Sequence, residues 1–229
     1  MKKIILILIS LFFFGNIFAQ QAISGGLYIG PTMSWMSTDS KVADTKGMKF
    51  GYNFGALVDF NLIDNFAIST GIQFNNLGGN IAYKYGFTNL KPKEGAVIDT
   101  VFPGTKIKYN LNYIGVPVSF KGKTNEIGYM TYFLKAGVTP LINIKTLGSF
   151  GENEKLMLKE INLFNVAWHI GGGIEYSLSG NTRILVEILY TGGLIDVDKT
   201  KVFDVPDMTS TSNPRIALND IHLKVGVLF

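Results

Sequence analysis

The segment from Met48 to Leu62 alternates in polarity along its whole length. Apolar side chains occupy every second position, and the positions between them are polar or glycine, except at Leu57. Successive side chains of a β-strand point to opposite faces, so a strand with this sequence has one apolar face and one polar face. The segment therefore predicts a two-sided strand.

The same pattern recurs in eight segments of the chain. The predicted strands are Ser24–Met36, Met48–Leu62, Phe66–Tyr85, Lys106–Lys121, Ile127–Lys145, Ile161–Leu178, Ile184–Tyr190 and Ile221–Phe229. In the fourth segment the apolar positions change phase after Tyr113. A change of phase by one residue is what a β-bulge produces, so a bulge is predicted in this strand.

The connections between these segments alternate in length. Long ones follow the odd-numbered segments, and they are Ser37–Gly47, Gly86–Thr105, Thr146–Glu160 and Asp196–Pro214. Outer-membrane barrels have short periplasmic turns and longer extracellular loops, and an even strand number leaves no unpaired edge in lipid. The pattern predicts an all-β fold: an eight-stranded antiparallel transmembrane up-and-down β-barrel whose two ends lie on the periplasmic side.

The first 19 residues have the features of a secretory signal peptide. Lys2 and Lys3 precede an apolar run that ends near Phe14, and the small residue Ala19 follows. The run is short for a membrane-spanning helix, although an uncleaved anchor is the alternative. We expect cleavage after Ala19, a single barrel domain over 20–229, and delivery to the bacterial outer membrane.

Composition argues against a soluble domain and against a nucleic-acid partner. The chain has 21 basic and 17 acidic residues, and loss of Lys2 and Lys3 leaves 19 basic residues, a net charge of about +2. Charged residues make up 17% of the chain, which is low for a soluble protein. A soluble barrel with its aromatic side chains inside is the alternative. The sequence has no cysteine, which excludes a lipid-anchored cysteine.

Ionisable side chains recur on the polar faces of the predicted strands. The candidates for a network inside the barrel are Lys49, Asp59, Lys135, His169, Glu175, Arg183, Glu187 and Lys224. An eight-stranded barrel has room inside for side chains but scarcely for a channel. We therefore predict a packed polar lumen held by ion pairs and hydrogen bonds. A path for protons, ions or small solutes is the alternative.

Only His169 and His222 can serve as histidine bases. A hydrolytic site needs a Ser or Asp partner close to one of them, so a membrane-embedded lipid-modifying enzyme stays open as an alternative. No pair of histidines or carboxylates has a recognised metal-ligand spacing. The sequence predicts a non-enzymatic protein with no cofactor and no metal.

Four short segments resemble the PorT-like outer-membrane β-barrel family of Bacteroidetes. They are Tyr113–Val118, Phe133–Gly137, Gly171–Tyr176 and Val225–Phe229. The resemblance implies an eight-stranded barrel, delivery by the outer-membrane insertion machinery, and Phe229 as the end of the insertion signal. The namesake of the family is associated with type IX secretion. Loops on a rigid scaffold commonly carry binding. The expected partners are thus outer-membrane lipid, the insertion machinery, and envelope or secretion proteins that contact the outer loops.

Overall fold

The computed structural model describes residues 23–38, 43–83, 87–90, 98–101, 104–150, 154–156, 161–197 and 215–229. The predicted signal peptide, 1–19, and most of the predicted fourth long loop lie outside these residues. Every regular element within them is a β-strand. In this part of the chain there is no helix with the length and apolar character needed to cross a membrane.

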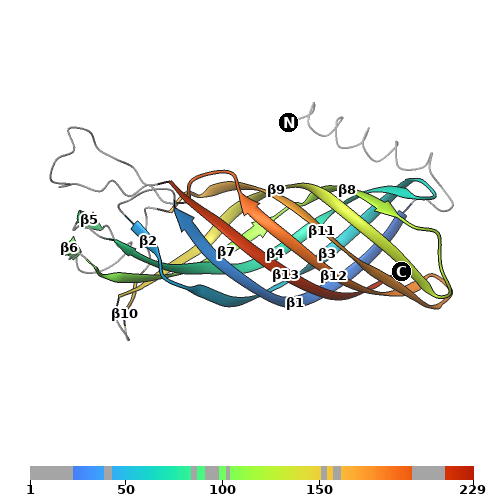
Figure 1. Cartoon of the computed structure of the whole chain (residues 1–229), viewed down its shortest axis with the longest axis horizontal. Helices are drawn as coiled ribbons and strands as arrows, with labels where there is room; N and C mark the ends of the chain where they lie inside the picture. The colour runs from blue at the N-terminus through green and yellow to red at the C-terminus, as the bar shows by residue number, and fades with distance from the viewer. Residues whose placement is uncertain are drawn as a thin grey trace, which may run out of the picture.

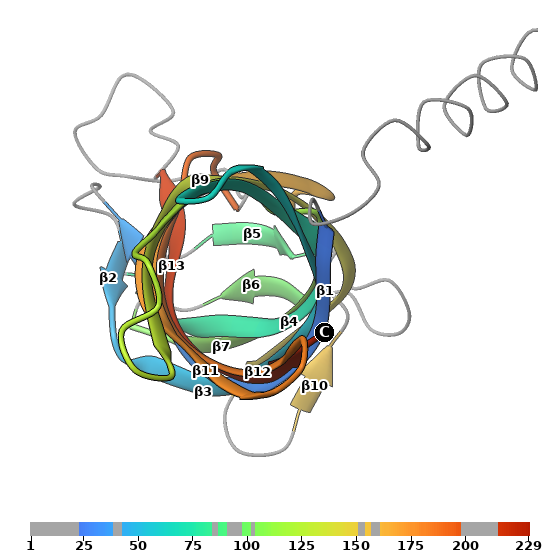
Figure 2. The same ribbon diagram turned by 90° about the vertical axis from the view of Figure 1, so that its right-hand side faces the viewer.

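Eight antiparallel strands close into a barrel (Figure 2). β7 and β8 lie end to end between β4 and β9 and together form one of the eight, and β1 closes the ring by pairing with β13. The predicted fold is confirmed. The barrel strands are β1 (Ile23–Thr38), β3 (Met48–Ile63), β4 (Phe66–Tyr83), β7 (Lys106–Gly115), β8 (Val118–Lys123), β9 (Met130–Phe150), β11 (Phe164–Ser179), β12 (Thr182–Gly193) and β13 (Ile216–Leu228).

The long and short connections lie at opposite ends of the barrel, as predicted. The short turns lie at the same end as the C-terminus (Figure 1). The other end carries β2 (Ala43–Thr45), β5 (Phe87–Leu90), β6 (Ile98–Val101) and β10 (Glu154–Leu156). We call these the lower end and the outer end. The predicted loop Thr146–Glu160 begins too early, because β9 continues in register with β7 as far as Phe150.

The barrel is strongly sheared and longer than a membrane requires. Following the strand pairing once around the ring from Met48 leads back to β3 at Val58, ten residues further along. Such a stagger corresponds to strands tilted by about 40°. β9 has 21 residues, whereas about 9–11 tilted residues cross a bilayer. Part of the barrel wall therefore projects beyond the hydrocarbon layer.

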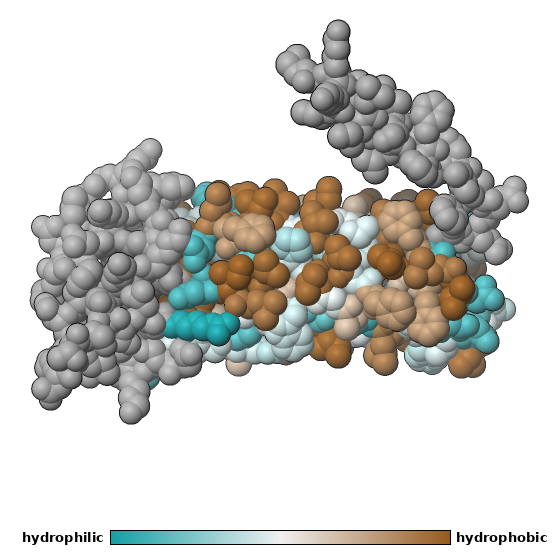
Figure 3. Space-filling model, turned by 90° about the horizontal axis from the view of Figure 1, so that it is seen from above, coloured by the Kyte–Doolittle hydropathy of each residue, from teal (hydrophilic) through white to brown (hydrophobic). Residues whose placement is uncertain are grey.

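Around much of the barrel, apolar side chains point outward and polar side chains point inward. Leu134 is 73% exposed, whereas its chain neighbour Lys135 is 8% exposed. The space-filling view shows apolar residues spread over this outer surface, with hydrophilic residues toward the ends (Figure 3). Leu57, the one residue that interrupts the polar face of β3, points inward and is buried.

The predicted bulge in the fourth strand is wrong. The backbone of β7 alternates without a break, with Tyr109 and Tyr113 buried inside and Ile114 exposed outside. What changes after Tyr113 is the polarity of the side chains on each face. The register shift lies instead in the facing strand β9, where Asn143 and Lys145 pair with successive residues of β7 and Ile144 is the extra residue.

Two prolines mark the interruption between β7 and β8. Val116 and Pro117 lie in this gap, and the Val116 amide donates to the carbonyl oxygen of Pro140 on β9 over 3.1 Å. Proline has no N–H to donate to a sheet. The hydrogen-bond ladder between these strands therefore breaks where Pro117 and Pro140 lie. The Thr70 hydroxyl of β4 donates to the Pro117 carbonyl oxygen over 2.8 Å and connects the interrupted segment to β4.

Candidate functional site: the filled lumen

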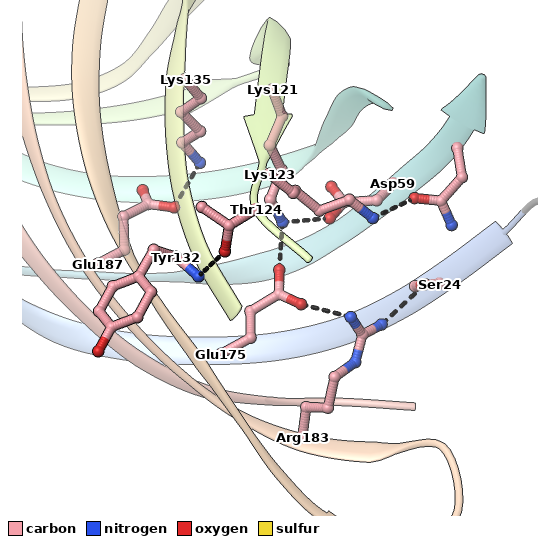
Figure 4. Close-up of polar contacts among 11 residues, drawn as sticks. Ser24, Asp59, Lys121, Lys123, Thr124, Tyr132, Lys135, Glu175, Arg183 and Glu187 are labelled. Carbon is pink, nitrogen blue, oxygen red and sulfur yellow. Dashed lines mark hydrogen bonds and ion pairs between the residues drawn. The ribbon is translucent and has the colours of Figure 1, made fainter. Parts of the chain in front are cut away.

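The lower part of the lumen contains a cluster of buried charges, here called the lower ion cluster: Asp59, Lys121, Glu175 and Arg183 (Figure 4). The Lys121 ammonium lies 2.5 Å from both the Asp59 and the Glu175 carboxylate. Arg183 contacts the other oxygen of Glu175. Two carboxylates therefore face two cations, and the pairing compensates the cost of burying them.

Sequence analysis placed three members of this cluster inside the barrel but missed Lys121. Lys121 is the last residue of the fourth predicted strand and was not among the candidates. Its alternation with Phe120, which is 53% exposed, was the signal that could have found it. The Lys121 ammonium also lies 4.4 Å from the centre of the Phe133 ring.

A second group, the middle ion cluster, joins Lys135, Glu187 and Lys224 from three different strands. Glu187 lies 2.6 Å from the Lys135 ammonium and 3.4 Å from the Lys224 ammonium. Lys224 also lies 4.6 Å from the centre of the Tyr28 ring. All three ionisable residues are at most 8% exposed. These three predicted residues therefore contact one another in the lumen and link β9, β12 and β13.

Each histidine contacts a polar side chain through both of its ring nitrogens. His169 Nε2 lies 2.6 Å from the Ser119 hydroxyl, and its Nδ1 lies 3.0 Å from the Thr139 hydroxyl. His222 Nδ1 lies 3.1 Å from the Thr32 hydroxyl, and its Nε2 contacts the Asp220 carboxylate. All of these side chains are buried inside the lumen.

Asp220 was missed by the sequence analysis because the predicted last strand began one residue later, at Ile221. The strand in fact begins at Ile216, which places Asp220 and His222 two residues apart on the same inner face. The three residues Thr32, His222 and Asp220 have the connectivity of a nucleophile, base and acid. Thr32 is only 1% exposed, so no substrate reaches this hydroxyl in the observed conformation.

Lys49 is the exception among the predicted lumen residues. Its ammonium donates to Asn76 Oδ1 near the outer end, and it contacts neither ion cluster. The prediction that Lys49 belongs to the lumen network is wrong. Asn76 lies where the outward face of β4 becomes polar, and Lys49 reaches toward that face.

The outer half of the lumen is filled by apolar side chains, here called the outer core. Ile107, Leu111 and Tyr113 are fully buried in it. The predicted packed polar lumen therefore describes only the lower part of the barrel. The members of the outer core are Met36, Leu77, Ile81, Ile107, Tyr109, Leu111, Tyr113, Leu141, Ile161, Ala167, Val197, Ile216 and Leu218.

These layers determine what the lumen can do chemically. Its cations in the two clusters are paired with carboxylates, and an apolar layer separates them from the outer end. Within the described residues no group of three or more His, Asp or Glu side chains converges as metal ligands would. The interior is built to hold the barrel wall together.

Phe229, the predicted end of the insertion signal, lies at the lower end and is 62% exposed. Its amide donates to the Gly25 oxygen over 2.8 Å, and its own oxygen accepts from the Gly25 amide over 2.9 Å. The aromatic ring is therefore held at the barrel surface while the backbone completes the closure between β13 and β1.

A closed antiparallel ring with an apolar exterior and paired charges inside is the architecture of a bacterial outer-membrane barrel. The family model "Outer membrane protein beta-barrel domain" matches residues 18–199. The chain belongs to this family and is located in the bacterial outer membrane.

Several solved outer-membrane structures are similar in shape. Ail of Yersinia pestis is 15% identical, with 92% of this chain and 100% of that chain covered and a TM-score of 0.41. OprG of Pseudomonas aeruginosa is 10% identical, with 92% and 97% covered and a TM-score of 0.46. The protease OmpT of Escherichia coli is 9% identical, with 93% and 97% covered and a TM-score of 0.46. Comparison with curated proteins gives no match. These similarities assign no activity to the chain.

Proposed function

We propose that the protein is a closed, non-enzymatic barrel that holds its outer loops above the membrane for binding to envelope partners or surface ligands. The outer core is the observation that carries this proposal. It makes the projecting part of the barrel a packed stalk, because Ile107 and Leu111 fill its interior with apolar side chains. Binding loops need such a rigid support.

Loop replacement tests the proposed binding role. In one variant the segments 86–105 and 198–214 are replaced by short Gly-Ser linkers, and the barrel strands and the core residue Val197 are unchanged. The variant is expected to insert normally but to fail to restore the envelope phenotype of cells that lack the protein. Full restoration by a correctly inserted variant would contradict a role for these loops.

A small-solute channel is the first alternative. The paired ions of the lower cluster and the apolar outer core support a lumen that does not conduct. We expect no conductance above background in planar bilayers. Steady conductance by the wild-type protein would overturn the proposal of a closed barrel.

A membrane-embedded lipid-modifying enzyme is the second alternative, and its bases would be His169 or His222. Their hydroxyl partners Ser119 and Thr32 are 3% and 1% exposed, which supports a structural role instead. The variant with both histidines changed to Gln is expected to leave membrane lipid composition unchanged. The electrophoretic shift on heating, which reports a folded barrel, checks that the variant has assembled.

A link to type IX secretion is the finer function that the PorT-like segments suggest. Two of these segments are neighbours in the wall, because Phe133–Gly137 on β9 pairs with the start of Gly171–Tyr176 on β11. The test is the amount of protein secreted by this pathway in a strain that lacks the gene. Unchanged secretion would remove this link and leave the surface-binding proposal intact.

A further inference from the structure

The outward face of β4, β7 and β9 changes character toward the outer end. Lower down it is apolar, with Ile114 exposed. Above this point it carries lysines and asparagines, here called the basic–amide patch. Its residues on these strands are Asn76, Lys106, Lys108, Asn110, Asn112 and Lys145, and Lys49 of β3 joins the patch through its contact with Asn76.

Hydrogen bonds connect the patch across neighbouring strands. Asn76 Nδ2 donates to Asn110 Oδ1 over 2.8 Å and to Asn112 Oδ1 over 2.5 Å. The Lys49 ammonium donates to Asn76 Oδ1. Asn112 pairs directly with Lys145, so the two side chains leave the same face of the sheet. The amides are thus held in fixed positions beside a cation.

The patch is strongly basic, with four lysines and no acidic residue among its members. Lys106, Lys108 and Lys145 are exposed. The sequences of β4, β7 and β9 contain no Asp or Glu at all. This contrasts with the lumen, where each ion cluster contains a carboxylate. Outside, these positive charges therefore favour an anion from the surroundings.

The position of the patch along the barrel axis indicates which anion lies beside it. Two residues before Asn76, Phe74 stacks on Phe54 with ring centres 5.0 Å apart, and on Tyr52 with centres 6.0 Å apart. Aromatic residues gather at the membrane–water interface of barrels. The patch lies just beyond these rings, on the outer side, at the level of the lipid headgroups.

We propose that the basic–amide patch binds the phosphate groups of phosphorylated glycolipid headgroups in the outer leaflet. Lysine ammonium groups supply charge-assisted hydrogen bonds to phosphate, and the asparagine amides donate to phosphate or sugar oxygens. This site lies on the barrel wall and goes beyond the proposed role of the loops. It orients the barrel in the membrane and surrounds one side of the stalk with bound lipid.

The test compares two double variants of the full-length protein in a nonionic detergent. Lys108→Gln with Lys145→Gln removes two charges from the patch. Lys123→Gln with Arg215→Gln removes two charges outside the patch, because Lys123 ends β8 at the lower end and Arg215 lies directly before β13. The probes are bisphosphorylated lipid A, the same lipid without phosphates, and inorganic phosphate, and the measurement is the apparent Kd. Heat-dependent electrophoretic mobility confirms that each variant is folded.

We expect wild-type protein to prefer the phosphorylated lipid, and the patch variant to bind it about 30-fold more weakly, since each lysine contributes on the order of a fewfold to tenfold near an anionic surface. The control variant should change little. Equal Kd values for lipid A with and without phosphates, or for wild-type protein and the patch variant, would overturn the proposal. If inorganic phosphate binds as tightly as lipid A through the same lysines, the site serves free phosphate and the lipid assignment is wrong.

Discussion

The lower and outer parts of the barrel are built with opposite polarity. In the lower part Glu175 is buried inside, whereas Phe120 faces outward. In the outer part of β7 Leu111 is buried inside, whereas Lys108 is exposed outside. The backbone alternates in the same way in both parts. The difference shows that the polarity of the inward side chains depends on the medium outside the wall. That medium is hydrocarbon around the lower part and water around the outer part.

The two parts are also stabilised by different forces. Ion pairs hold the strands together where the outer face lies in lipid, because burial of apolar groups between strands gives little advantage over contact with lipid. In the projecting part water surrounds the wall, so apolar side chains gain stability by packing inside. Substitutions in each part of the barrel test this division.

Removal of one lower carboxylate has the largest expected effect. Glu175→Gln leaves the buried Lys121 and the half-buried Arg183 with one carboxylate fewer, and breaking a buried pair costs about 3 to 5 kcal/mol. The free energy of unfolding in lipid vesicles, from urea titration, is the measurement. Glu126→Gln is the matched control, because Glu126 is exposed and bonds only to Ser177 among the contacts described. Equal losses in the two variants would contradict the structural role of the cluster.

A cavity in the outer core is expected to cost nearly as much. Leu111→Ala removes a fully buried side chain, and such changes destabilise proteins by about 2 to 5 kcal/mol. The same change at Leu134, which is 73% exposed to the lipid side, leaves no internal cavity. We expect a clearly smaller loss for Leu134→Ala in the same unfolding measurement. A larger loss at Leu134 would show that the outer core is not a packed core.

Alternation in the sequence was sufficient to predict the strands, their order and the side of each connection. It also placed Asp59, Glu175 and Glu187 inside the barrel. This works because a side chain's direction in a strand follows directly from its position in the chain. In the lower part of the wall most polar residues of the strands face inward, although buried apolar residues such as Leu57 and Leu185 lie among them. The direction of most side chains there can therefore be inferred from the sequence alone.

The same reasoning failed on β7 because a change in polarity phase has two physical causes. Either the backbone bulges, or the medium outside changes while the backbone continues. The sequence of Lys106–Tyr113 looks the same in both cases. We predicted a backbone bulge, whereas the structure shows a continuous backbone and a change of the medium outside. The outer core was missed for this reason. The partner of each lumen charge depends on barrel shear, which no single strand encodes.

A charge on the outer surface distinguishes the two parts of the wall directly. Val186 lies on the outward face of β12, between Ile184 and Ile188, where Val186→Arg is expected to cost about 2 to 4 kcal/mol. Ala217 lies on the outward face of β13 toward the outer end, and Ala217→Arg is expected to cost less than about 1 kcal/mol. Unfolding in vesicles measures both. Similar costs would place the membrane boundary elsewhere.

The smallest effect on stability is expected at the lower end, at Phe229. Deletion removes the two backbone hydrogen bonds with Gly25, each worth about 1 kcal/mol, and exposes no core. If Phe229 is also the end of the insertion signal, deletion slows assembly into the outer membrane far more than this small loss explains. Phe229→Tyr keeps both the aromatic ring and the backbone bonds, so it should assemble at the normal rate. Pulse-labelling with the heat-modifiability assay measures the assembly rate, and normal assembly of the truncated chain would show that Phe229 only closes the barrel.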